Sequence, residues 1–256
     1  MQQPSIDLNS DLGESFGAYR VGYDAELFPL ISSANVACGL HGGDPRVMER
    51  TVRLAAEHGV AVGAHPSYPD LVGFGRRVMA SSPDEVRTDV LYQLGALDAF
   101  CRAVGVRMRH VKAHGALYNH ATTDATTAAA IAAAVAAFDP ELILFAMPGS
   151  ALFLAGEAAG LTVAREAFAD RAYNADGTLV SRREPGALIT DPEEAARRMV
   201  RLVREGRLTS IDGKEIDLDA ESICIHSDTP GANEIARVVR RRLTDAGIAV
   251  RAPGVT

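Results

Sequence analysis

Seven short apolar runs alternate along this chain with longer segments of helical character. The runs are SIDLNSDL (5–12), ISSANVACG (31–39), VAVGAHP (60–66), RHVKAHG (109–115), LILFAMPG (142–149), TVAREAFA (162–169) and SICIHSD (222–228). Nearly continuous apolar strands separated by helices are typical of parallel strands that are covered on both faces. Seven such units favour a closed (β/α) barrel over an open sheet, and IAVRAP at 248–253 offers a short eighth strand.

Capping residues and glycines mark the ends of the expected helices. Four helices are predicted to begin where a capping side chain precedes proline, at Asp44-Pro45, Ser82-Pro83, Asp191-Pro192 and Thr229-Pro230. Glycine just past a helix C-terminus adopts a left-handed conformation, which is expected at Gly59, Gly105, Gly160, Gly206 and Gly247. No linker divides the chain, so residues 1–256 are predicted to form one domain.

One segment departs from this alternation. Residues 171–190, RAYNADGTLVSRREPGALIT, contain an Asp-Gly turn and no helical stripe, which predicts a hairpin-like flap over one end of the barrel. A second Asp-Gly, at 212–213, predicts another hairpin and places Lys214 near an exposed turn.

Charge and composition exclude several classes of protein. The chain has 256 residues, is 47% hydrophobic and carries a formal charge of -7, which argues against nucleic acid or an anionic membrane as its main partner. No apolar run approaches a membrane span, and the N-terminus lacks a signal pattern. The three cysteines form no CxxC pair. We therefore expect a reduced, cytoplasmic protein.

Polar side chains follow the expected strands, at the point where each strand ends. These residues are Asn9, Asp11, Glu14, Asn35, Cys38, His41, His65, Lys112, His114, Glu166, Asp170, Arg171, His226 and Asp228. In a parallel barrel, the carboxyl ends of the strands form the face where catalytic groups converge. A single histidine at such a place is as readily structural as catalytic. Three histidines with Asp11 on converging strands favour an active site.

Lys112 is one of only two lysines, against 24 arginines, and it stands inside a strand-like run. Lysine is a compact charge that can meet a substrate carboxylate or phosphate, or stabilise a developing oxyanion. The structural alternative is an ion pair with Asp11 or Asp228 that only holds the barrel rim. We favour the functional role, in which replacement by alanine lowers turnover by orders of magnitude and leaves the fold intact.

Several familiar motifs are missing. There is no G-x-x-x-x-G-K-[ST], no G-x-G-x-x-G after a strand and no HExxH. A metal held by Asp11, His41, His65 or His114 is chemically reasonable, but their wide spacing leaves its presence undecided.

Seven stretches resemble the lactam-utilisation family (LamB/YcsF). They are DLNSDLGESFG (7–17), SSANVACGLHGGDP (32–45), GAHPSYPDLVGFGRR (63–77), YQLGAL (92–97), HVKAHGALYN (110–119), EAFADRAY (166–173) and ICIHSDTPGA (223–232). The resemblance implies an irregular seven-stranded barrel of the glycosidase/deacetylase type. It also implies the role of the A subunit in the ATP-dependent 5-oxoprolinase, which converts 5-oxo-L-proline, ATP and water to L-glutamate, ADP and phosphate. Subunits B and C are then the expected partners, ATP is the co-substrate, and the lactam is the small-molecule substrate.

Under this resemblance we expect six catalytic residues: Asp11, His41, His65, Lys112, His114 and Asp228. Asp11 with His41 or His65 would position and deprotonate water, while Lys112 and His114 would stabilise the oxyanion or phosphoryl group. Asp228 would orient a histidine or protonate the leaving nitrogen. The expected substrate-binding residues are Asn9, Glu14, Asn35, Asp170, Arg171 and His226, with Arg171 pairing with the substrate carboxylate.

Two other functions fit the same residues. The first is a stand-alone metal-dependent deacetylase or amidohydrolase that acts on another small amide. The second is a non-catalytic subunit that binds the lactam and docks on its partners.

Overall fold

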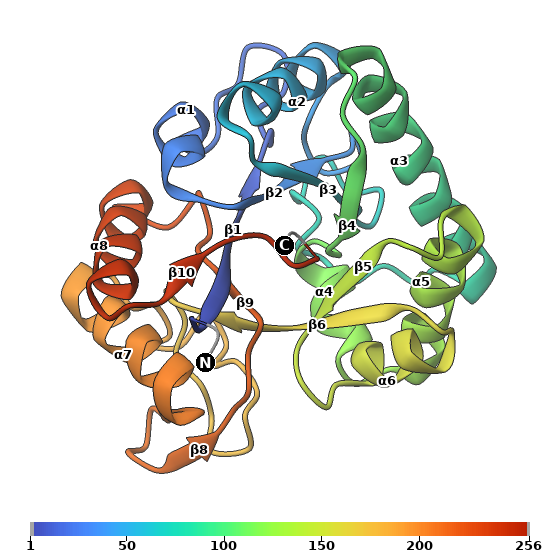
Figure 1. The fold of residues 1–256 in the computed structure, drawn as a ribbon. Helices are drawn as coiled ribbons and strands as arrows, with labels where there is room; N and C mark the ends of the chain where they lie inside the picture. The colour runs from blue at the N-terminus through green and yellow to red at the C-terminus, as the bar shows by residue number, and fades with distance from the viewer. Residues whose placement is uncertain (1–2, 255–256) are drawn as a thin grey trace.

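A closed parallel barrel forms the centre of the computed structural model, which describes residues 3–254. Its seven strands are β1 (Ser5–Leu12), β2 (Ser33–Ala37), β3 (Ala61–His65), β4 (Met108–Val111), β5 (Ile143–Ala146), β6 (Thr162–Phe168) and β9 (Ser222–Cys224). Each strand pairs with the next, and β9 pairs with β1 to close the ring (Figure 1). The predicted seven-stranded barrel is therefore confirmed. The expected eighth strand is β10 (Ala249–Val250), which pairs with the start of β1.

Helices surround the barrel (Figure 1). They are α2 (Pro45–His58), α3 (Pro83–Val104), α4 (Gly115–Ala121), α5 (Ala125–Phe138), α6 (Ala151–Ala158), α7 (Pro192–Glu205) and α8 (Ala232–Asp245), with the short α1 (Asp24–Leu27) and η1 (Phe28–Leu30) between β1 and β2. The small side chains of α5 let it pack against both α3 and α6. No single helix in residues 3–254 is long and apolar enough to cross a membrane, and α4 and α5 reach that length and composition only as a pair bent by 114°.

Three of the four predicted helix starts are confirmed. Asp44 and Asp191 accept hydrogen bonds from the first free amides of α2 and α7, and Ser82 forms a reciprocal capping box with Glu85. The fourth prediction was wrong, because α8 begins at Ala232 after a left-handed Gly231. The Thr229 hydroxyl instead donates to Asp170 Oδ2 at 2.5 Å, so this side chain holds a carboxylate at the mouth of the barrel and does not cap the helix.

All five glycines predicted to follow helices have positive φ. Gly59, Gly105 and Gly206 cap α2, α3 and α7 directly, each in the left-handed conformation. This agreement confirms that the helix ends can be read locally, since only glycine adopts this backbone conformation at little cost.

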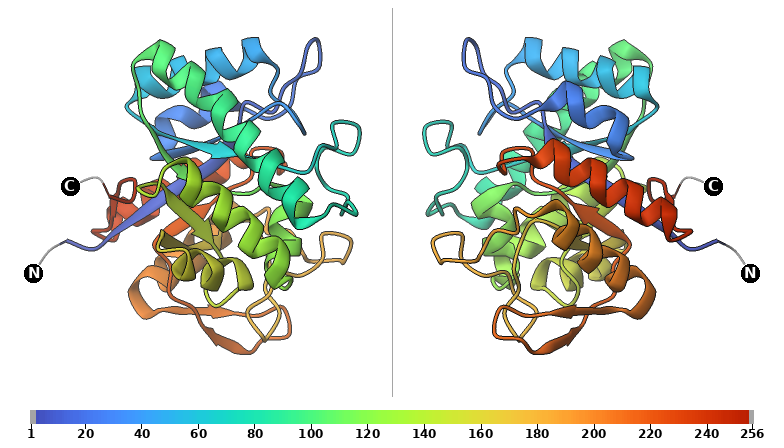
Figure 2. Two further views of the ribbon diagram at one scale, coloured as in Figure 1. Left: turned by 90° about the vertical axis from the view of Figure 1, so that its right-hand side faces the viewer. Right: turned by 90° about the vertical axis from the view of Figure 1, so that its left-hand side faces the viewer.

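Two irregular segments extend from the barrel. The hairpin predicted around residues 212–213 is confirmed as β7 (Arg207–Thr209) paired antiparallel with β8 (Glu215–Asp217). Residues 171–190 contain no helix and fold on themselves through bridges from Arg171 to Leu188 and from Tyr173 to Leu179. Figure 2 shows this gold loop, with the teal loop between β3 and α3, projecting from the barrel end opposite the termini. A flap function for the gold loop stays a prediction.

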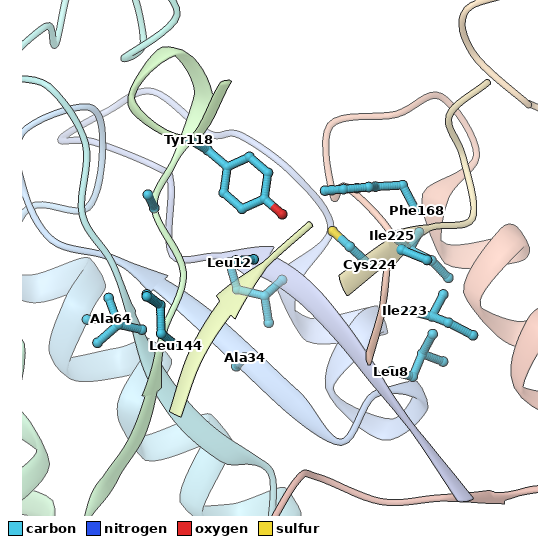
Figure 3. Packing of buried hydrophobic residues seen from close by; sticks show 14 of the residues in the cluster. Leu8, Leu12, Ala34, Ala64, Tyr118, Leu144, Phe168, Ile223, Cys224 and Ile225 are labelled. Atoms are coloured by element: carbon cyan, nitrogen blue, oxygen red, sulfur yellow. The ribbon is translucent and has the colours of Figure 1, made fainter. Parts of the chain in front are cut away.

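The apolar core lies between the barrel wall and the helices. Leu8 and Leu12 of β1 are fully buried, and Leu8 is in register with Ile223 of β9 (Figure 3). Successive side chains of a strand point to opposite faces. The residues of β1 that alternate with these leucines therefore point into the barrel. They are Asp7, Asn9 and Asp11, and they form a polar interior.

Candidate active site

The polar interior of the barrel holds a hydrogen-bonded layer built on two asparagines. Asn35 Nδ2 donates to Asn9 Oδ1 at 2.7 Å and to Asp11 Oδ1 at 2.9 Å, while His110 Nε2 donates to Asn35 Oδ1 at 2.8 Å. Asn9 Nδ2 donates to Glu166 Oε1 at 3.1 Å. Both side-chain amides are fully buried, and their hydrogen bonds are made to neighbouring side chains. The structure thus places Asn9 and Asn35, which we expected to bind substrate, beneath the cavity, where they position charged groups.

Lys112 stands above this layer in a buried ion network. Its Nζ lies 2.9 Å from Glu166 Oε1, 3.1 Å from Asp11 Oδ1 and 2.9 Å from Cys224 Sγ. Burial alone would lower the pKa of Lys112, but Asp11, Cys224 and Glu166 raise it well above its usual value. Burial would likewise raise the pKa of Asp11, yet His65 and Lys112 hold it well below its usual range. Both groups are therefore charged at neutral pH.

Three histidines from different strand ends meet beside this network. His65 Nε2 and His114 Nδ1 lie 3.0 Å apart, and the rings of His41 and His114 stack with centroids 3.7 Å apart. Burial holds the pKa of His41 and of His114 well below the usual histidine value. The ring of Phe74 packs edge-on against both His41 and His114. The three rings expected to converge from the sequence are thus brought together.

Two carboxylates face these imidazoles. Glu14 Oε1 lies 3.2 Å from His41 Nε2 and 3.4 Å from His114 Nδ1, and Asp11 Oδ2 lies 3.5 Å from His65 Nε2. Burial, followed by the charge of Asp11, raises the pKa of Glu14 to about 7. Glu14 was expected to bind substrate, but the structure makes it a partner of the histidines.

A second histidine–carboxylate pair stands across the mouth. His226 Nδ1 lies 3.0 Å from both oxygens of Asp170. Burial would raise the pKa of Asp170, but the charge and hydrogen bond of His226 and the hydroxyl of Thr229 lower it to about 2. Asp170 is fully buried and holds His226, whose ring stacks on Phe168.

The remaining two expected site residues lie nearer the rim. Arg171 is buried, donates from Nη2 to Val180 O at 2.5 Å, and has its pKa lowered to about 10 by burial and by Arg182. Asp228 pairs with Arg76 at 2.5 Å and lies 3.9 Å from Arg182. These two neighbours are arginines, so the structure does not bring Asp228 to the histidine that we expected it to orient.

A cavity of about 950 Å³ opens over these groups. The expected site residues that line it are Asp11, His65, Lys112, His114, Arg171 and His226. Its walls come from α4 and from residues 176–183 of the irregular segment. Asn9, Glu14, Asn35, His41, Asp170 and Asp228 are not among the lining residues.

Sequence reasoning gave no role to several residues of the site. Glu166 stood among the strand-end residues, but its contact with Lys112 depends on which strands face each other. Arg76, Tyr118 and Phe168 line the cavity, and Cys224 is in register with Asn9 on the neighbouring strand. Figure 3 shows the Tyr118 hydroxyl and the Cys224 thiol pointing toward the same space. Only the alternation of side chains along β9 could have indicated Cys224.

Within residues 3–254, two groups of buried or half-buried side chains have ligand atoms close enough to hold a metal ion. The first is Glu14 with His41, His65 and His114, and the second is Asp11 with Cys224 and His226. Within each group the potential ligand atoms all lie within 4.8 Å of one another. Imidazole and carboxylate ligands suit first-row transition metals.

The fold and site define a closed parallel β/α barrel with a buried cluster of ionisable groups at the carboxyl ends of its strands, where barrel enzymes carry their active sites. The chain belongs to the LamB/YcsF family, whose model matches residues 6–255. This agrees with the resemblance seen in the sequence.

Relatives in this family match along nearly their whole length. A protein of Symbiobacterium thermophilum, named as the A subunit of 5-oxoprolinase, is 61% identical over 249 residues, which cover 97% of this chain and 95% of the relative. A protein of the same name from Pyrococcus furiosus is 51% identical over 245 residues, covering 96% of each chain. The crystal structure of the lactam utilization protein from Thermus thermophilus is 56% identical, covers 97% of this chain and 99% of its own, and superimposes with a TM-score of 0.93.

Proposed function

We propose that this chain is the A subunit of an ATP-dependent 5-oxoprolinase and takes part in opening the ring of 5-oxo-L-proline. The observation that carries the proposal is the full-length match to relatives named as the A subunit of 5-oxoprolinase, at 51–61% identity. The cavity supports it, because charged groups of both signs line a space large enough for a small substrate.

The reaction explains why ATP is needed. A five-membered lactam is a stable amide whose ring closes readily, so its carbonyl must be activated. Transfer of the γ-phosphoryl group to the lactam oxygen releases ADP and produces an activated carbon. Water then adds to this carbon and the C–N bond breaks as the nitrogen takes a proton, which leaves an acyl phosphate on the opened chain. A second water hydrolyses this acyl phosphate, which releases phosphate and yields glutamate.

The charged groups suit these steps. We assign Lys112 to stabilise negative charge on the lactam oxygen or its phosphoryl group, because its ammonium is fixed at the cavity floor. The ionised Asp11 accepts a hydrogen bond from the attacking water and orients it. Arg171 pairs with the substrate carboxylate. His226, held by Asp170, supplies the proton to the leaving nitrogen, a role that we had expected of Asp228.

Subunits B and C are the proposed partners of this chain. The sequence has no G-x-x-x-x-G-K-[ST] loop, so we assign at least part of ATP binding to the partner subunits. The arginines at the rim, Arg76 and Arg182, line the cavity and are placed to meet a phosphorylated species that enters it.

Glutamate release from 5-oxoproline and ATP tests this proposal, with the chain alone compared to the chain plus its two partner subunits. We expect release only from the three-subunit mixture. Lys112→Met should lower that turnover by about 100-fold or more, whereas Lys214→Met, at the exposed hairpin turn, should leave it unchanged. Normal turnover with Lys112 replaced would support a binding subunit without catalytic residues. If the three-subunit mixture released no glutamate, 5-oxoproline would be rejected as the substrate.

A stand-alone metal-dependent amidohydrolase is the second candidate, and the cluster of Glu14 with three histidines favours it. This candidate predicts amide hydrolysis by the chain alone, without ATP, that is lost on treatment with a chelator. Turnover that requires ATP and both partners would reject it.

A further inference from the structure

The hydrogen bonds of His65 and His114 fix which ring nitrogen of each carries a proton. His65 Nδ1 lies 2.8 Å from the backbone oxygen of Lys112, and His114 Nε2 lies 2.8 Å from the backbone oxygen of Phe74. A carbonyl oxygen only accepts, so both of these nitrogens must donate. In the neutral rings, the other nitrogen of each then bears a lone pair.

These two remaining nitrogens, His65 Nε2 and His114 Nδ1, face each other at 3.0 Å. Two lone pairs repel at this distance, so a proton or a metal cation must lie between or beside them. The surroundings are rich in buried carboxylates, since Asp11, Glu14 and Glu166 are all enclosed and Lys112 contacts two of them. The geometry therefore calls for an additional positive charge next to these nitrogens.

Glu14 completes a set of three ligands. Its Oε1 lies 3.4 Å from His114 Nδ1, and the three ligand atoms lie within 4.8 Å of one another. Zinc binds nitrogen and oxygen at about 2.0–2.1 Å, which puts tetrahedral ligand atoms roughly 3.3 Å apart. The separations of 3.0 and 3.4 Å are close to that value.

We propose that His65, His114 and Glu14 bind a divalent transition-metal cation of the zinc class at the floor of the cavity. Two histidines and one glutamate form a three-ligand set that leaves a position for water or substrate. The inference concerns the ion alone and stands whether or not the lactam is the substrate.

His41 belongs to the support of this site. Its ring is stacked on His114 with an angle of 4° between the planes. Parallel rings cannot both direct in-plane lone pairs at one ion, so His41 instead donates from Nε2 to Glu14 Oε1 at 3.2 Å. The backbone oxygens of Lys112 and Phe74 orient the two histidine ligands in the same way. Such outer hydrogen bonds are the usual companions of metal-binding histidines.

The second possible group, Asp11 with Cys224 and His226, is a weaker site for an ion. The ammonium of Lys112 contacts both Asp11 Oδ1 and Cys224 Sγ, at 3.1 and 2.9 Å. The ammonium of Lys112 already supplies a positive charge to Asp11 and Cys224, and it would repel a metal cation bound to the same two side chains. In contrast, His65 and His114 both line the cavity, which gives an ion a path of entry.

Metal analysis of the purified, untagged chain tests the proposal directly. After incubation with zinc and dialysis, we expect about one ion per chain. Glu14→Gln and His114→Asn should each weaken zinc binding by on the order of 100-fold or more. His226→Ala, in the other group, and His58→Ala, at the exposed end of α2, serve as controls that should retain the ion. Circular dichroism shows whether each variant is folded.

Two outcomes would overturn the inference. One is a folded, unaltered chain that binds no zinc, cobalt or nickel, which would mean that His65 and His114 share a proton. The other is loss of the ion in His226→Ala and its retention in Glu14→Gln, which would move it to the second group. These measurements use neither 5-oxoproline nor ATP, so their failure is distinct from failure of the proposed reaction.

Discussion

Lys112 illustrates how one side chain satisfies several buried acceptors. Its three N–H donors face Glu166, Asp11 and Cys224, each at about hydrogen-bond distance. The compact ammonium group fits between these elements, whereas the planar fork of arginine favours bidentate pairing with one carboxylate. This gives a physical reason for a lysine here in a chain that otherwise uses arginine.

Replacing Lys112 by methionine should therefore affect stability as well as turnover. The change leaves Asp11 and Glu166 buried without their cation, which should lower the free energy of unfolding by about 3–5 kcal/mol. Urea denaturation measures this loss, and Lys112→Met with Glu166→Gln should recover part of it. Lys214→Met should change stability by less than about 0.5 kcal/mol. An equal effect of the two lysine replacements on the free energy of unfolding would contradict the ion network. A variant that loses stability but stays folded in the absence of urea agrees with both expectations for Lys112.

Asp170 should make stability depend on pH in the acid range. Its pKa in the folded chain is about 2, below the ordinary value of 3.8, so ionised Asp170 stabilises the fold at neutral pH. The shift corresponds to roughly 2 kcal/mol. This contribution is complete above about pH 4 and is lost as the pH falls toward 2.

Comparison with Asp170→Asn tests this assignment. The variant should be less stable than the unaltered chain at pH 7, and the difference should shrink between pH 4 and pH 2. Thermal unfolding across this range provides the measurement. A difference that stays constant as the pH falls would show that Asp170 is not ionised in the folded protein.

At the scale of elements, alternation along the strands sorts the side chains between two environments. On β1, Leu8 and Leu12 face the helices while Asn9 and Asp11 face the barrel interior. Gly63 on β3 leaves room in this interior for the ring of His110 on β4. An added Cβ at Gly63 would lie 2.1 Å from that ring.

Gly63→Ala should consequently displace His110 and weaken its hydrogen bond to Asn35. We expect the free energy of unfolding to fall by about 1–3 kcal/mol, as measured by urea denaturation. The matched control is Gly95→Ala on α3, where an added Cβ meets no atom within 4 Å. That change should stabilise the helix by about 0.5–1 kcal/mol. Equal effects at the two glycines would show that the barrel interior can adjust.

At the scale of the whole molecule, the reactivity of the three cysteines indicates how often the folded chain unfolds globally. Cys38, Cys101 and Cys224 are all buried and form no disulfide, and they belong to different parts of the fold. Burial raises the pKa of Cys38 and of Cys101 to about 12, and that of Cys224 well above its usual value. None is therefore a reactive thiolate while the chain is folded.

The folded protein should resist alkylation by iodoacetamide at neutral pH, whereas the chain in denaturant should take up three labels. Mass spectrometry of intact protein counts them over time. Labelling of the three thiols should proceed together, because global opening exposes all of them. Early labelling of Cys224 alone would instead reveal local opening of the site.

Local sequence signals predicted much of the fold. The strand runs, the caps at Asp44, Ser82 and Asp191, and the second hairpin depend on interactions within a few residues, so they can be read from the chain directly. Thr229 is the informative exception. Its hydroxyl donates to Asp170, 59 residues away in the sequence, and α8 begins at Ala232.

By itself, the sequence determined the alternating pattern, hence the barrel, and it determined which residues end the strands. Only the tertiary structure decided which of them meet. Lys112 finds Glu166 and Cys224, while Asp228 pairs with Arg76 across 152 residues. The physical reason is that periodicity and capping are local, whereas the partners of a buried charge depend on barrel closure, which brings distant strand ends into one low-dielectric space.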